Sequence, residues 1–176
     1  MNHDQPNRRD ILKGLGLAGA GLAMGSCALS QNANAQSASA KAGKTVMGLV
    51  VPPMETVRVA HIGVGARGSG HVGHMLNLQG VEVVAICDNH DPSAQRAAKR
   101  CVDAGKTAPK VFSGSDYAYR KMLEMDNIDI VIIATPWEWH TPMCVDSMNA
   151  GKHAFTEVPA AVTAEECQQL VDTAEK

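Results

Sequence analysis

Three glycines, Gly63, Gly65 and Gly68, spell G-x-G-x-x-G between two segments of different character. They follow the short apolar run at 57–62 and precede a stretch with near-helical apolar spacing. In such a turn the first glycine permits the tight bend, the second lets a pyrophosphate approach the backbone, and the third lets the helix pack closely on the strand. Free N–H groups at the helix start would bind the phosphates. The pattern predicts a dinucleotide-binding turn, with a purely structural glycine turn as the alternative.

A carboxylate stands where such a turn requires one. Asp88 ends the apolar run at 81–88, about 20 residues beyond Gly68, which is the usual distance to the acidic residue that binds the adenosine ribose. A negative charge at this place would also repel a 2′-phosphate. The predicted cofactor is therefore NAD rather than NADP.

Both tryptophans of the chain lie in the stretch ATPWEWHTPM, at 134–143. The segment from Pro136 to His140 follows the most apolar run of the sequence, and open α/β sheets bind ligands outside the carboxyl ends of their strands. We expect a loop in which Trp137 and Trp139 line the nicotinamide-ribose half of the cofactor and His140 hydrogen-bonds to it. The alternative is a pair of indoles that packs an interdomain surface.

Strand-like and helix-like segments alternate from residue 57 onward. Short apolar runs predict strands at 57–63, 81–88, 110–114, 128–136 and 153–159. Amphipathic or capped segments predict helices at 71–79, 92–104, 117–125, 141–150 and 163–176. This alternation, with strands apolar enough for burial on both faces, predicts the α/β class with a doubly wound parallel sheet, the Rossmann NAD-binding fold. That fold has about six strands, so we expect a domain that is incomplete, without its last strand and a second α+β domain.

The first 35 residues are typical of a signal peptide. Arg8 and Arg9 precede a Gly/Ala/Leu stretch that is too short and too glycine-rich to span a bilayer, and the segment ends in a small-residue cleavage pattern at Ala35. The paired arginines resemble a twin-arginine (Tat) export signal, which predicts a periplasmic protein. Lipid attachment at Cys27 is the alternative. Residues 36–55 are expected to form a linker.

The composition narrows the classes of partner. With 16 Lys+Arg against 18 Asp+Glu, the net charge is -2, and no basic surface for nucleic acid is expected. His71 and His74 lie three apart, but no third ligand accompanies them, so we predict no metal site. A sheet without its last strand would leave an edge unpaired, and association into a homo-oligomer is one expectation.

Several of these motifs together carry a family resemblance. A twin-arginine leader, GVGARG, DNHDP, TPWEWHTPM and TEVPAAVT resemble the Gfo/Idh/MocA oxidoreductase superfamily over residues 57–176. More narrowly, they resemble glycosyl hydrolase family 109, which includes NAD-dependent α-N-acetylgalactosaminidases. The resemblance implies that NAD contacts Ala66, Arg67, Asp88, Trp137, Glu138, Trp139, His140, Glu157 and Val158.

One departure from the wider superfamily bears on the activity. Dehydrogenases there usually carry Glu-Lys-Pro, and the lysine serves the substrate hydroxyl, whereas this chain has Glu157-Val158-Pro159. Valine cannot move a proton, so an NAD-dependent sugar dehydrogenase is the less favoured alternative. The resemblance implies instead a glycosidase that acts through transient oxidation of the sugar at C3, elimination, water addition and re-reduction. NAD-dependent glycosidases are known exceptions to the two-carboxylate rule.

The substrate partner implied by the resemblance is a small-molecule glycoside, with terminal α-N-acetylgalactosamine as the expected sugar. A cofactor regenerated within each turnover can stay bound, which suits an exported enzyme. The family keeps its acid/base residues in the second domain, so no catalytic residue is assigned. A non-catalytic NAD-binding remnant is a third hypothesis.

Overall fold

The computed structural model describes residue 46 and residues 49–176. The predicted signal peptide, 1–35, lies outside these residues, and so does most of the predicted linker, 36–55. The described part of that linker contains neither helix nor strand. No helix within the described part of the chain is long and apolar enough to cross a membrane.

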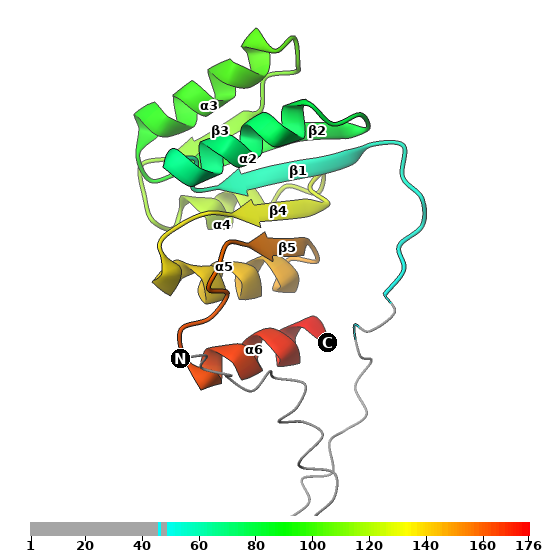
Figure 1. The fold of residues 1–176 in the computed structure, drawn as a ribbon, viewed down its shortest axis with the longest axis vertical. Helices are drawn as coiled ribbons and strands as arrows, with labels where there is room; N and C mark the ends of the chain where they lie inside the picture. The colour runs from blue at the N-terminus through cyan, green and yellow to red at the C-terminus, as the bar shows by residue number, and fades with distance from the viewer. Residues whose placement is uncertain (1–45, 47–48) are drawn as a thin grey trace, which may run out of the picture. The chain divides into compact units, whose positions relative to one another are not determined.

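Five parallel strands form one sheet in the order β3-β2-β1-β4-β5 (Figure 1). Their bounds are β1 Val57–Ile62, β2 Val81–Asp88, β3 Lys110–Ser113, β4 Ile130–Ile133 and β5 His153–Thr156. The sequence pattern predicted all five strands, and the predicted parallel α/β sheet is confirmed. Because the strands are parallel, their carboxyl ends and the loops that follow them meet at one edge of the sheet.

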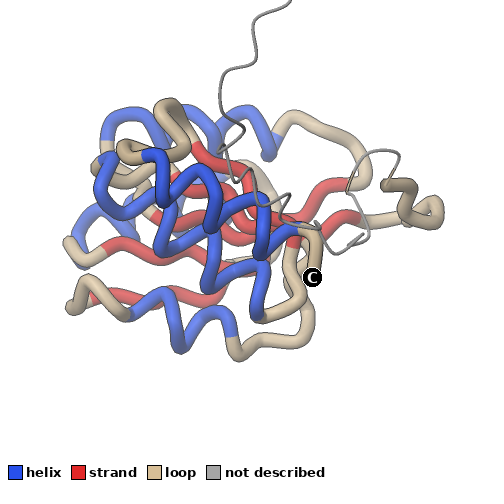
Figure 2. Tube along the Cα trace, turned by 90° about the horizontal axis from the view of Figure 1, so that it is seen from below, coloured by secondary structure: helices blue, strands red, loops and turns tan. Residues whose placement is uncertain are grey.

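Helices cover both faces of this sheet (Figure 2). Their bounds are α2 Ala66–Leu76, α3 Asp91–Asp103, α4 Ala118–Leu123, α5 Trp137–Asn149 and α6 Ala164–Ala174. Two buried clusters show the layers. On one face, α2 and α3 pack through residues such as Val72 and Ala97. On the other, α4 and α5 pack through residues such as Met122 and Met143.

Two helices begin earlier than the sequence predicts. The prediction for α5 was 141–150, but the helix begins at Trp137, so the tryptophans occupy its first turn rather than a loop. Proline disfavours the helical conformation in the residue before it, yet the helix continues through Pro142. The structure uses Pro136 as the N-cap, and its carbonyl accepts the N–H of Trp139 at 2.9 Å. Similarly, α2 begins at Ala66 rather than 71, within glycine-rich sequence that shows no apolar period.

Candidate NAD site at the carboxyl edge of the sheet

The turn between β1 and α2 needs two of its three glycines for its shape. Gly63 has φ +78, and a Cβ atom there would come within 2.6 Å of the carbonyl oxygen of Ala134. At Gly68, a Cβ atom would overlap the carbonyl oxygen of Gly63. Gly65 differs, because a Cβ atom there would have nothing within 4 Å. The backbone at Gly65 is therefore open to a ligand, as the pyrophosphate of NAD requires.

The start of α2 is equipped to receive an anion. Its N-cap is Gly65, which offers no side chain to the first N–H groups, and the first turn carries no acidic residue. The first N–H groups of a helix have no partner within the helix, and its dipole is positive at this end. A phosphate group can therefore satisfy these donors. This arrangement fits the dinucleotide that the sequence predicts.

Asp88 lies beside the glycine turn, at the end of β2. Its Oδ2 accepts the backbone N–H of Val64 at 2.8 Å, and its Oδ1 accepts the N–H of His90 at 2.9 Å. Each carboxylate oxygen has a second lone pair for a ribose hydroxyl. The two backbone bonds fix the direction in which the carboxylate points.

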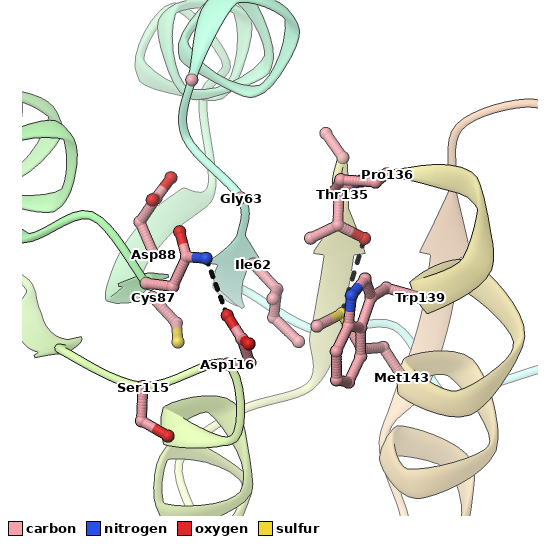
Figure 3. A pocket seen from close by; sticks show the side chains of 13 residues that line it. Ile62, Gly63, Cys87, Asp88, Ser115, Asp116, Thr135, Pro136, Trp139 and Met143 are labelled. Carbon is pink, nitrogen blue, oxygen red and sulfur yellow. Dashed lines mark hydrogen bonds between the residues drawn. The ribbon is translucent and has the colours of Figure 1, made fainter.

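A cavity of about 220 Å³ opens between the loops at this edge. Figure 3 shows Asp88 and Asp116 on one side, with Trp139 and Met143 on the other. On the side of Asp88 and Asp116, the side-chain amide of Asn89 donates a hydrogen bond to Asp116 Oδ1 at 2.7 Å. The full lining is Ile62, Gly63, Gly65, Cys87, Asp88, Asn89, Ser115, Asp116, Ala134, Thr135, Pro136, Trp139 and Met143.

The structure separates the two tryptophans. Trp139 lines the cavity and packs edge-on against Tyr117, with ring centroids 5.5 Å apart. Trp137 does not line it and is 63% exposed. Trp139 thus shares a cavity with Asp88, which the sequence assigns to the adenosine ribose, whereas both indoles were predicted to face the nicotinamide half. Glu138, also in the predicted set, is exposed in the same helical turn.

His140 has partners other than the one predicted. It is 1% exposed; its Nδ1 lies 2.7 Å from the carbonyl oxygen of Pro159 and its Nε2 lies 2.8 Å from that of Thr135. The neighbouring Thr141 donates to the carbonyl of Ala160 at 3.0 Å. Both ring nitrogens of His140 are therefore occupied by backbone, and the side chain joins the start of α5 to the segment after β5. In this geometry neither ring nitrogen of His140 is free to form the predicted hydrogen bond with the nicotinamide half of the cofactor.

Glu157, which directly follows β5, is brought against the glycine turn. Its Oε1 accepts from Arg67 Nε at 2.5 Å and lies 2.6 Å from His71 Nε2. These two partners lower the pKa of the Glu157 carboxyl to about 2. Of the predicted set, Arg67 and Glu157 are therefore in direct contact, although 90 residues separate them in sequence. Val158, the next residue, is 79% exposed.

Some site residues were missed by the sequence analysis. Asp116 and Ser115 reach the cavity from the turn after β3, and their position at the carboxyl edge of a strand was the available signal. His71 was interpreted as an ordinary helix-face residue near the nucleotide rather than as a metal ligand, and no partner was predicted for it. Among the described residues no group of three His, Cys, Asp or Glu side chains is placed to hold a metal ion, and His71 instead contacts Glu157.

Comparison with known proteins gives this site a family context. Residues 57–176 match the model of an oxidoreductase family with an NAD-binding Rossmann fold, Gfo/Idh/MocA. Among solved structures, myo-inositol dehydrogenase from Lactobacillus casei, in complex with NAD(H) and myo-inositol, is 31% identical with a TM-score of 0.58, over 67% of this chain and 33% of that one. The WlbA dehydrogenase from Bordetella pertussis, in complex with NADH and UDP-GlcNAcA, is 25% identical with a TM-score of 0.58, over 68% and 34%.

Curated relatives are more similar in sequence. Glycosyl hydrolase family 109 protein 1 from Shewanella sp. (strain MR-4) is 56% identical over 76% of this chain and 29% of its own length. Alpha-N-acetylgalactosaminidase from Shewanella oneidensis is 54% identical over the same shares, 76% and 29%. A family 109 protein from Shewanella baltica (strain OS155) is 50% identical over 97% of this chain and 37% of its own length. The chain thus spans about a third of the length of these relatives.

Proposed function

Because the chain belongs to the Gfo/Idh/MocA oxidoreductase family, whose fold binds NAD, we propose that it is the NAD-binding part of a glycosidase of the family 109 type. The proposed reaction is hydrolysis of a terminal α-N-acetylgalactosamine glycoside. The solved neighbours are dehydrogenases of 25 to 31% identity, whereas the relatives at 50 to 56% carry glycosyl hydrolase names. The greater similarity supports the hydrolase.

Val158 is the observation that carries this proposal. The residue follows Glu157 after β5, outside the lining of the cavity, and its side chain is largely exposed. A lysine there could exchange a proton with a substrate hydroxyl, which is the role that the resemblance assigns to it in dehydrogenases. An isopropyl group has neither a donor nor an acceptor. Val158 therefore disfavours a dehydrogenase that relies on a lysine at this position to exchange a proton with the substrate, and it is compatible with the proposed glycosidase.

The residues of this chain bind and orient the cofactor. When bound, NAD supplies a hydride acceptor that oxidises C3 of the sugar and is restored within the same turnover. The N–H groups at the start of α2 would hold the pyrophosphate, and Asp88 would hold a ribose. Trp139, which lines the same cavity, would shield one side of the dinucleotide from water. The cofactor need not be exchanged, because the reaction has no net redox change.

The test of this function uses the chain joined to the carboxyl-terminal two thirds of the Shewanella oneidensis relative. We expect the purified chimera to release p-nitrophenol from p-nitrophenyl α-N-acetylgalactosaminide without added NAD. In heavy water the released sugar should carry deuterium at C2, because elimination removes that hydrogen and solvent returns one. The matched control is the same chimera with Gly65→Ala, which should fold but bind NAD weakly, because the new methyl has open space in the protein alone and lies where the pyrophosphate approaches.

Two results would count against the glycosidase. Accumulation of NADH from free N-acetylgalactosamine, without glycoside cleavage, would support the dehydrogenase instead. Cleavage without any deuterium at C2 would show hydrolysis by a route that does not use transient oxidation.

A further inference from the structure

Two side chains of α2 hold the carboxylate of Glu157. Arg67 and His71 are four residues apart, so they lie on the same face of the helix. Both contacts end on one oxygen, Oε1, at 2.5 Å from Arg67 Nε and 2.6 Å from His71 Nε2. The helix that begins at the predicted phosphate site is thereby tied to the segment that follows β5. A carboxylate with two donors on one oxygen cannot rotate without breaking both bonds.

The charge on Glu157 determines what His71 must do. The two partners hold the pKa of the Glu157 carboxyl at about 2, so the group is an anion near neutral pH. An ionised carboxylate only accepts hydrogen bonds. The Nε2 atom of His71 must therefore carry a hydrogen and donate it. Since Oε1 already receives two donors, Oε2 is the oxygen better placed to accept from a further group.

The two partners of Glu157 differ in how firmly they are held. The side chain of Arg67 is 74% exposed, whereas that of His71 is 24% exposed. His71 also lines an apolar groove on the α2 face of the sheet, together with Met75 and Val158. A long exposed arginine gains little net energy from one ion pair, because ordering it costs side-chain entropy. The imidazole is the more rigid of the two partners.

We propose that His71 is a positioning residue for cofactor binding: it fixes Glu157 so that the remaining oxygen can accept a hydrogen bond from the bound NAD. This inference rests on the proposed function, and on the place of Glu157 directly after β5, where it is bonded to Arg67 in the first turn of the helix that begins at the predicted phosphate site. His71 itself does not touch the cofactor in this arrangement. Its contribution is the donor at Nε2, and any side chain with a donor at that place can replace it.

The test compares substitutions that keep or remove this donor. His71→Gln places an amide N–H near the position of Nε2, while His71→Leu has similar bulk and no donor. By calorimetry on the full chain, we expect His71→Leu to weaken NAD binding about tenfold, the scale of one charge-assisted hydrogen bond. His71→Gln should stay within about threefold of the unsubstituted protein. His74→Leu, an exposed position on the same helix, is the matched control and should leave NAD affinity unchanged.

A double-substitution cycle distinguishes positioning from general stability. If His71 acts through Glu157, His71→Leu should weaken NAD binding less than about twofold in a Glu157→Gln background. If His71→Leu does not fold, His71→Asn, whose donor is too short to reach Oε1, takes its place with the same expected loss. Equal NAD affinity of the Leu variant and the unsubstituted protein would overturn the proposal for His71 alone. A chain that binds no NAD at all would overturn both this proposal and the proposed function.

Discussion

Asp88 accepts the backbone N–H of Val64 at 2.8 Å, across 24 residues of sequence. The side chain assigned to the adenosine ribose therefore also holds the glycine turn to the end of β2. Binding and local structure depend on the same carboxylate, because one of its oxygens stabilises the backbone that must meet the pyrophosphate. Substitutions at Asp88 need to separate these two roles.

Asp88→Asn separates them in part, because its amide oxygen can still accept the N–H of Val64, while its amide nitrogen cannot accept the N–H of His90. We expect this variant to keep the glycine turn, to be less destabilised than Asp88→Ala, and to lose the preference for NAD, since the charge that repels a 2′-phosphate is gone. Asp88→Ala should cost NAD affinity about 1–3 kcal/mol, and it should also lower the thermal unfolding midpoint. Calorimetry with NAD and NADP on the three proteins is the measurement. Equal affinity of the unsubstituted protein for both nucleotides would contradict the role of Asp88.

The glycines of α2 and its turn predict three different outcomes for the same substitution. Gly68→Ala should destabilise the fold, because the added Cβ would overlap the Gly63 carbonyl. Gly65→Ala has open space in the protein alone, so it should fold but bind NAD weakly, because the new methyl lies where the pyrophosphate approaches. Gly70→Ala, also unobstructed and within α2, should stabilise the helix by roughly 0.5–1 kcal/mol and leave NAD binding intact. Thermal unfolding with and without NAD separates the three.

The two tryptophans provide a probe that is specific to the cavity. Trp139 lines it and Trp137 does not, and the chain has no other tryptophan. NAD should therefore change the fluorescence of Trp139. We expect the NAD-dependent change to persist in Trp137→Phe and to disappear in Trp139→Phe. A response that follows Trp137 instead would place the dinucleotide outside the cavity.

The sheet was predictable because its signals are local. Each strand is a short apolar run that ends at a turn residue. Thr163 and Glu166 predict the start of the last helix, and the structure contains the two reciprocal capping hydrogen bonds between them. The starts of α2 and α5 were not predictable in this way. The first turn of α2 contains Gly68, and α5 carries Pro142 in its second turn. Local propensity disfavours both residues in helices, and tertiary contacts determine where these helices begin.

The residues of the candidate site were predictable in part, and their contacts were not. Gly63, Gly65 and Asp88 follow a spacing with a known physical basis, and they do meet at one edge. Nothing in the sequence indicates that Glu157 would be bound by Arg67 and His71, because that contact joins segments 86 to 90 residues apart. Likewise, the position of His140 beside two tryptophans suggested that it contacts the ligand. In the structure it is buried, and its two ring nitrogens lie against backbone carbonyl oxygens.

The export route is a further proposal, and it falls on residues that the structure does not describe. Arg8 and Arg9 resemble the twin-arginine signal, so replacing both with lysine should keep the precursor in the cytoplasm while its charge is unchanged. Cell fractionation followed by immunoblotting measures the distribution. Cys27→Ala is the matched control, and it should leave export unaffected if the protein is not lipid-anchored. Undiminished periplasmic protein in the double-lysine variant would contradict the Tat route.

His61 predicts how the stability of the domain depends on pH. This residue of β1 is 1% exposed, and neither ring nitrogen has a hydrogen-bond partner within the described part of the chain. Burial lowers the pKa of His61 from 6.5 to about 4. Between these two values the unfolded chain takes up a proton that the folded chain does not, so stability is complete above pH 6.5 and falls as the pH decreases toward 4. For this one group, the free energy of unfolding should drop by on the order of 2 kcal/mol between pH 7 and pH 5.

Replacing His61 with leucine should remove that dependence, because leucine fills a similar volume and takes up no proton. We expect urea unfolding at pH 7 and pH 5 to give a smaller difference in unfolding free energy for His61→Leu than for the unsubstituted protein. The variant should also be at least as stable at pH 7, since it no longer buries two unpaired ring nitrogens. His74→Leu, on the exposed face of α2, serves as the control and should retain the original pH dependence. If His61→Leu loses as much stability at pH 5 as the unsubstituted protein does, the acid sensitivity resides in another group.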